Sequence, residues 1–95
     1  LEGGWLYNQR KTELEHHPLV ERTFNNALYG LLGAHFDPIA LVGRQVVAGT
    51  NYAIFCSITP VVPNGERHFG MVTVNDGLDG KDTLVTIEDV EIGLN

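Results

Sequence analysis

The histidines, the single cysteine and the acidic residues are the side chains of this sequence that could perform catalysis or hold a metal. His16 and His17 are adjacent, so they cannot share one helix face at the four-residue spacing used by many zinc sites. His35 and His68 each stand alone in the sequence. We therefore predict no metal site.

Cys56 could act as a nucleophile if a histidine lay beside it to take its proton. It lies in the middle of the apolar segment NYAIFCSI, where a buried and unreactive thiol is the better interpretation. Ser57 and Thr59 fit the polar positions of a half-exposed strand. Because no HExxH, CxxC or glycine-rich phosphate loop is present, we predict a protein that is not an enzyme and uses no cofactor.

The segment NDGLDGKD, residues 75–82, has the closely spaced aspartates of a calcium loop without the required pattern. A calcium loop needs Asp-x-Asp-x-Asp-Gly and a closing Glu at its twelfth position. Two Asp-Gly pairs are instead typical of a hairpin turn, because they supply residues with positive φ. We predict a solvated hairpin here.

Length and charge limit the classes of protein that remain. The 95 residues suit a single domain over residues 1–95, and 43% of them are apolar, which is enough for one core. The net charge is −6, and the six basic residues are scattered without a basic stripe, so nucleic acid and anionic membranes are poor partners. No apolar run approaches the roughly 20 residues of a membrane-spanning helix, so we expect a soluble protein.

One helix and several strands must position any functional residues. Pro18 suits a first helical position, and Gly33 suits a stop, so the pattern predicts a helix over residues 18–32. Gly30, inside that range, should cost about 1 kcal/mol relative to alanine. The apolar stripe of this helix consists of Val20, Phe24, Ala27, Leu28 and Leu31.

The rest of the chain reads as strands over residues 39–47, 52–62, 68–74 and 84–92, with a bulge near Gly43-Arg44. We predict an α+β fold, in which the long helix covers one face of a four- to five-stranded antiparallel sheet. The helix should lie on the side of Ile54, Cys56 and Ile58, which leaves Phe55 on the opposite face.

The segment QVVAGTNY, Gln45–Tyr52, puts small, turn-forming residues (Ala48–Asn51) between two strands. Its first five residues resemble the Gln-x-Val-x-Gly first-hairpin motif of the cystatins, inhibitors of papain-like cysteine proteases. All eight residues are especially similar to the stefin branch, which lacks disulfides, and this chain has one cysteine. The order of an N-terminal glycine, a long helix and two hairpins also resembles the cystatin plan.

The resemblance implies a cystatin-like fold and a wedge of three segments that enters the cleft of a papain-like cysteine protease. Reversible, tight binding would block the protease without cleavage of the inhibitor. The residues implied as protease contacts are Gly3, Gly4, Gln45, Val46, Val47, Ala48, Gly49 and Leu78. A domain-swapped homodimer through residues 45–49 would hide the first loop.

The second hairpin departs from the family. Many cystatins carry Pro-Trp there and stefins carry Leu-Pro-Gly, whereas this chain has Leu78-Asp79-Gly80, which puts a charge near the rim. Trp5 follows the N-terminal glycines, and we expect it to pack on the body of the domain.

The alternative function is a non-inhibitory module of the same fold, which binds a protein partner on the open sheet face around Phe55 and Phe69. The sequence begins at Leu1 without Met, so we expect the natural start to have been removed. The compartment stays open: cytoplasmic for a stefin-like protein, secreted or periplasmic if a signal peptide preceded Leu1.

Overall fold

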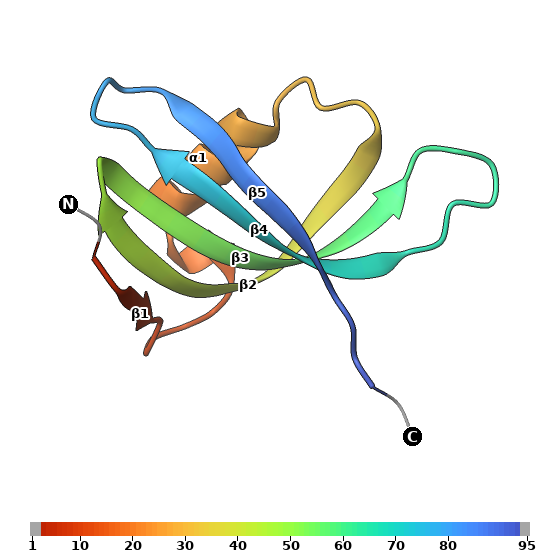
Figure 1. Cartoon of the computed structure of the whole chain (residues 1–95), viewed down its shortest axis with the longest axis horizontal. Coiled ribbons are helices and arrows are strands. Elements are labelled where there is room, and N and C mark those ends of the chain that lie inside the picture. The colour runs from red at the N-terminus through yellow and green to blue at the C-terminus, as the bar shows by residue number, and fades with distance from the viewer. Residues whose placement is uncertain (1–2, 94–95) are drawn as a thin grey trace.

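The computed structural model describes residues 3–93, which form a five-stranded antiparallel sheet with one α-helix packed on it (Figure 1). The helix α1 spans Pro18–Leu28, and a short 3-10 turn, η1, spans Leu14–His16 before it. The strands are β1 (Trp5–Tyr7), β2 (Ala34–Val47), β3 (Gly49–Pro60), β4 (His68–Asp76) and β5 (Asp82–Val90). The predicted α+β arrangement of one helix on an antiparallel sheet is confirmed.

The strands follow one another in space as they do in sequence, in the order β1-β2-β3-β4-β5. Each consecutive pair is antiparallel, and hairpins join β2 to β3, β3 to β4 and β4 to β5. The tips of the β2–β3 and β4–β5 hairpins therefore lie at the same end of the sheet, and Gly3, which is hydrogen-bonded to Val46, lies there as well (Figure 1).

The core lies between α1 and the helix-facing side of the sheet. Ile54, Cys56 and Ile58 are buried there, as predicted, together with Val20 and Phe24 of the helix. The helix packs mainly on β4 and β5. Thr23 and Asn26 of α1 also donate hydrogen bonds to the Asp82 carboxylate, at 3.3 and 2.8 Å, which ties the helix to the start of β5.

The helix is shorter than the predicted range of residues 18–32. It ends at Leu28, and Gly30 follows it with a φ of +83°, so this glycine serves the turn and does not weaken a helix interior. Leu31 lies outside the apolar stripe and is 43% exposed. Among residues 3–93, no helix has the length and apolarity needed to cross a membrane.

The strand boundaries differ from the predicted ones mainly at the hairpins. β2 begins at Ala34, before the predicted Ile39, because irregular register between Pro38 and Ala40 lets the strand accommodate a proline. The predicted bulge near Gly43-Arg44 lies slightly earlier, between Leu41 and Gly43. β3 and β5 start and end two or three residues before their predicted bounds, and β4 extends to Asp76.

Gly43 allows the short edge strand β1 to pair with β2. A Cβ atom at this position would lie 2.6 Å from the carbonyl oxygen of Leu6, so only glycine permits this approach. Beyond β1, the Asn8 side chain donates to the carbonyls of Leu41 and Lys11, at 3.1 and 3.0 Å. These contacts hold the N-terminal segment along β2.

Candidate functional site

The β2–β3 hairpin is tighter than the four-residue tip predicted for Ala48–Asn51. Ala48 is its only residue outside the strands, because Val47 pairs with Gly49 and Gln45 pairs with Asn51. The reversal requires a φ of +86° at Gly49, a conformation that side-chain-bearing residues rarely adopt. The motif therefore lies mostly in strand geometry, with a single residue at the turn.

Gly49 also brings the first hairpin against the second. A Cβ atom on Gly49 would lie 2.1 Å from the carbonyl oxygen of Asp76 and 3.0 Å from the Cα of Gly77. Both neighbours are backbone atoms, which cannot rotate away as the end of a side chain can. The absence of a side chain at Gly49 is thus a condition for the two hairpins to lie side by side.

The N-terminal glycines lie along the other side of the first hairpin. The backbone N–H of Gly3 donates to the carbonyl of Val46 at 2.8 Å. The Gln45 side chain donates in turn to the carbonyl of Gly3 at 3.0 Å. Gly4 is exposed, and an added Cβ there would meet nothing within 4 Å. Gly3 is therefore the anchored glycine of the pair.

A chain of side-chain amides crosses the sheet behind these tips. Asn75 of β4 donates to Asn51 of β3 at 2.9 Å, and Asn51 donates to Gln45 of β2 at 3.2 Å. Asn75 also donates to the carbonyl of Ala48 at 3.3 Å. With the bond from Gln45 to Gly3, this chain links both hairpins and the N-terminal segment in one direction, which favours mutual polarisation of the bonds.

The β4–β5 hairpin carries Leu78 at its tip. Its turn closes with hydrogen bonds from Gly77 N–H to the Lys81 carbonyl and from Gly80 N–H to the Gly77 carbonyl, at 2.9 and 3.0 Å. Leu78 is 85% exposed. We call the set of residues 3–4, 45–49 and 77–80 the three-segment edge, because these segments meet at one end of the sheet.

The three-segment edge offers contacts and no apparent covalent chemistry. Val46 is 56% exposed, Ala48 is exposed, and Asp79 is its one carboxylate. No histidine, serine or cysteine lies within the edge. Such a surface can bind through apolar contact and backbone hydrogen bonds.

Cys56 is fully buried in the core, as predicted. Burial, with a smaller effect of the Asp37 carboxylate, raises the pKa of its thiol to about 12. The thiol therefore stays protonated at neutral pH, which opposes a nucleophilic role.

Asn51 and Asn75 are the residues of this end that the sequence analysis missed. Asn51 lies within QVVAGTNY and Asn75 begins NDGLDGKD, but neither segment predicted that the two side chains would bond to each other. They meet Gln45 only because β2, β3 and β4 are aligned so that Gln45 faces Asn51 and Asn51 faces Asn75. The strand register is the signal that would have identified them.

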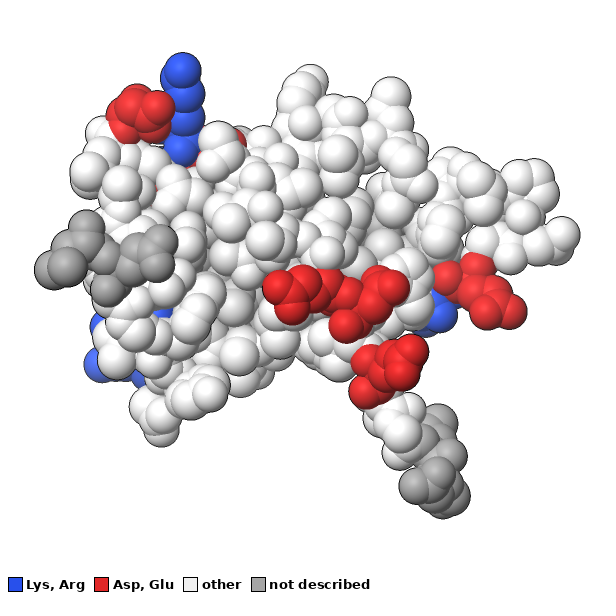
Figure 2. Space-filling view, viewed as in Figure 1, with Lys and Arg blue, Asp and Glu red and all other residues white. Residues whose placement is uncertain are grey.

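The sheet face opposite α1 carries the aromatic pair named in the alternative function. The rings of Phe55 and Phe69 stack with centroids 5.2 Å apart, and both residues are half-buried. Trp5 is 42% exposed and lines a shallow depression of about 260 Å³ beside Met71, so it packs only partly on the domain. Figure 2 shows acidic side chains gathered along the C-terminal part of β5 and little charge over most of the visible face.

A small acidic group lies on η1, away from the three-segment edge. Single ligand atoms of Glu13, Glu15 and His16 come within 4.8 Å of one another, and all three residues are exposed. The pKa of Glu13 is lowered, mainly by hydrogen bonding to its own backbone. Exposed groups of this kind are common without a metal ion.

Comparison of the chain with protein-family models, with curated proteins and with solved structures found no match.

Proposed function

We propose that this chain is a cystatin-like, stefin-like inhibitor of papain-like cysteine proteases, which occludes the active-site cleft with the three-segment edge. The observation that carries the proposal is the meeting of segments far apart in sequence: Gly3 and Asn75 are hydrogen-bonded to the segment Gln45–Gly49, and the backbone of Gly77 lies close against Gly49. The eight residues Gln45–Tyr52, which resemble the stefin motif, form the central segment.

The geometry of the edge suits insertion into a narrow cleft. Ala48 and Gly49 present almost no side chain, so backbone can approach both walls of a groove. Val46 and Leu78 add exposed apolar surface on either side of this tip. Since long strands and the amide chain already fix the loops, little conformational entropy is lost when they bind.

The proposed inhibitor acts by binding alone, without cofactor, metal, nucleic acid or membrane. It need not present a peptide bond to the catalytic thiol, so it dissociates uncut. Asp79, beside Leu78, is exposed and places a negative charge at the rim of the edge. We therefore expect the affinity for a given protease to depend on the charge of its cleft margin.

Titration of papain activity with the purified chain tests this function. We expect inhibition at micromolar concentration or below, and Leu78→Asp should weaken it at least tenfold because a charge replaces an apolar contact. Leu32→Asp is the matched control, since Leu78 and Leu32 are both 85% exposed and Leu32 lies at the other end of the sheet. Gly49→Trp is a poor probe, because any side chain at Gly49 would collide with the backbone of Asp76.

Two outcomes would contradict the proposal. One is the absence of inhibition of papain and of related cysteine proteases at micromolar concentration. The other is equal inhibition by the Leu78→Asp and Leu32→Asp variants together with full inhibition by Ala48→Trp, which would show that the edge does not enter the cleft.

The Phe55–Phe69 stack supports a second candidate, a non-inhibitory module that binds a protein partner on the open sheet face. The same assay separates the two functions. Phe55→Asp should leave papain inhibition unchanged if the three-segment edge is the functional surface. A chain that ignores proteases and loses a captured partner on Phe55→Asp would favour the second candidate.

A further inference from the structure

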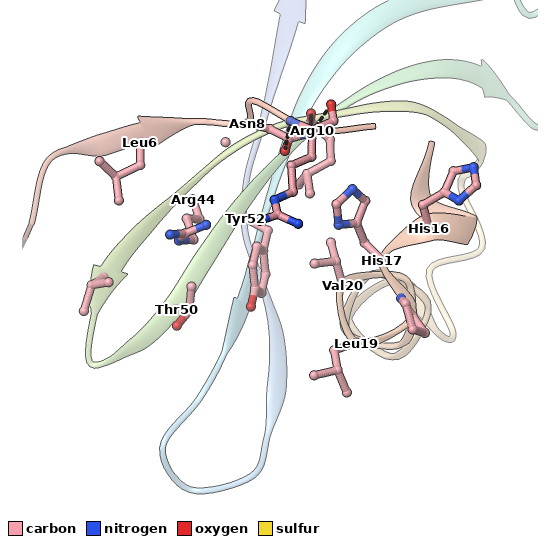
Figure 3. A pocket seen from close by; sticks show the side chains of 14 residues that line it. Leu6, Asn8, Arg10, His16, His17, Leu19, Val20, Arg44, Thr50 and Tyr52 are labelled. Atoms are coloured by element: carbon pink, nitrogen blue, oxygen red, sulfur yellow. Dashed lines mark hydrogen bonds between the residues drawn. The ribbon is translucent and has the colours of Figure 1, made fainter. Parts of the chain in front are cut away.

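A cavity of about 570 Å³ lies between the start of α1 and strands β1–β3 (Figure 3). It exists because α1 packs mainly on β4 and β5, which leaves the helix-facing side of β1 and β2 partly uncovered. Its volume lies within the range of roughly 300–1,000 Å³ typical of small-molecule sites. Of the residues in the three-segment edge, only Val46 also lines this cavity, and the open-face alternative does not use it.

The walls of the cavity are mostly apolar. Leu6 comes from β1, Leu41 and Val46 come from β2, and Leu19 and Val20 come from α1. Tyr52 of β3 adds an aromatic ring, and Figure 3 shows that ring facing the interior from the sheet side. A ligand bound here would meet a hydrocarbon-like surface over most of its length.

Two arginines, Arg10 and Arg44, also line this cavity. They are two of only six basic residues in a chain whose net charge is −6. Within residues 3–93, neither guanidinium takes part in an ion pair or a side-chain hydrogen bond, although acidic residues outnumber basic ones twofold. Five N–H donors on each guanidinium thus remain available to an anion.

Backbone contacts fix the position of each arginine in the chain. The backbone N–H of Arg10 donates to the Asn8 side chain at 3.1 Å, which shapes the loop after β1. Arg44 pairs with Leu6 on one side and with Tyr52 on the other, so its side chain lies on the cavity side of β2. In Figure 3 the side chain of Arg10 extends toward Tyr52 and His17, and His17 is itself hydrogen-bonded to the carbonyl of Lys11.

Asp76 does not line the cavity, but it affects the ionisation of Tyr52, which does. Burial, and then the Asp76 carboxylate, raise the pKa of Tyr52, while Arg44 acts in the opposite direction. The Tyr52 hydroxyl therefore stays neutral and can donate a hydrogen bond. Among the described residues that line the cavity, Arg10 and Arg44 are the only members of the Lys, Arg, Asp and Glu set.

We propose that this cavity binds a small amphipathic carboxylate, with its apolar tail between β2 and the start of α1 and its carboxylate on Arg10 and Arg44. Apolar walls explain the tail, and the two guanidinium groups, which form no ion pair within residues 3–93, explain the charged head. A fatty acid or an aryl-alkanoic acid carries this chemistry. The inference does not rest on the proposed protease inhibition, although Val46 belongs to both surfaces.

Titration of the ¹⁵N-labelled chain with octanoate, followed by amide NMR shifts, tests the site. We expect octanoate to shift the amides of cavity-lining residues, above all Arg44, Tyr52 and Val20. Arg10→Gln combined with Arg44→Gln should weaken binding roughly tenfold or more, because charged hydrogen bonds are lost. Arg22→Gln combined with Arg67→Gln is the matched control, since neither of these arginines lines the cavity, and should change affinity less than about twofold.

Two ligand controls separate the roles of tail and head. Octan-1-ol, which has the tail without the charge, and acetate, which has the charge without the tail, should each bind much more weakly than octanoate. Leu19→Glu offers a second variant, because Leu19 is 62% exposed and an acid there should repel the carboxylate without unfolding the chain. Octanoate shifts spread over unrelated surfaces, equal binding of octanol, or unchanged affinity in the double arginine variant would each overturn the site.

Discussion

The two ends of the sheet use their loops in different ways. At the three-segment edge, side-chain and backbone hydrogen bonds join loops that are distant in sequence, and the connection between β2 and β3 is a single residue. At the other end, which we call the far end, residues 29–33 join α1 to β2 and residues 61–67 join β3 to β4. One backbone bond, from Val61 to Gly33 at 3.1 Å, links these two longer loops.

Exposed apolar residues occur at both ends, so exposure alone does not distinguish them. Leu32, Val61 and Val62 of the far end are at least 61% exposed, as are many residues of flexible loops. The difference lies in how firmly the backbone is held. A loop fixed before binding loses less entropy on docking, so the three-segment edge is the better candidate for a binding surface.

The largest expected effect on stability is the difference between two single variants, each of which replaces a glycine at one end of the sheet with alanine. Gly49 and Gly30 both have positive φ, but an added Cβ collides with the Asp76 carbonyl only at Gly49 and meets nothing at Gly30. We expect Gly30→Ala to lower the free energy of unfolding by about 1–2 kcal/mol, the cost of a left-handed residue. Gly49→Ala should lower it by more than about 3 kcal/mol, because the hairpins must also separate.

Urea unfolding of both variants measures these costs, and size-exclusion chromatography adds a second readout. Strand exchange through residues 45–49 relieves a strained hairpin, so Gly49→Ala should also raise the share of dimer. Equal stability of the two variants, with both monomeric, would mean that the two ends are held alike.

The buried face of the sheet, the helix that covers it and the second hairpin could be predicted from local sequence patterns. The alternation of Ile54, Cys56 and Ile58 identified the buried face, and the helix stripe of Val20 and Phe24 identified what covers it. These predictions succeeded because burial depends on side-chain period within one segment. The paired Asp-Gly steps likewise located the second hairpin, whose tip is Gly77–Gly80.

The remaining features depend on contacts between segments. The helix ends at Leu28 because the turn at Gly30 leads into β2, and the apolar residues Leu31 and Leu32 concealed that stop. Likewise, the amide chain and the cavity with its two arginines depend on strand register and on where α1 rests. Neither is encoded in a local motif, so a single sequence could not reveal them.

The thiol of Cys56 should make the stability of the fold depend on pH. Cys56 pairs with Pro38 and Gly70 in the half of β3 that leads to the far end. Its folded pKa is about 12, and an unfolded thiol ionises near 8.5, so above that pH the unfolded state releases a proton that the folded state retains. Stability should therefore fall as pH rises, by about 2 kcal/mol between about pH 8.5 and about pH 10.5.

Urea unfolding across this pH range, compared with Cys56→Ala, isolates the thiol, because other titrating groups are common to both chains. Thiol labelling at neutral pH should proceed only as fast as global unfolding if the far half of the sheet stays closed. Faster labelling would show that the far end opens locally, and it would sharpen the contrast between the two ends.

The smallest expected effect tests the amide chain itself. Asn51→Leu keeps the size of the side chain and removes its bonds to Gln45 and Asn75, so we expect a loss of about 1–2 kcal/mol. The first residues of β2, next to the far end, offer a matched control in the exposed contact of His35 with Asp37 at 3.1 Å, and His35→Ala should cost less than about 0.5 kcal/mol. Hydrogen exchange makes the test local: in Asn51→Leu, the Gly3 amide bonded to Val46 should exchange faster, while the Val61 amide bonded to Gly33 should not change. If both amides respond equally, the amide chain stabilises the whole sheet and does not hold one end ready to bind.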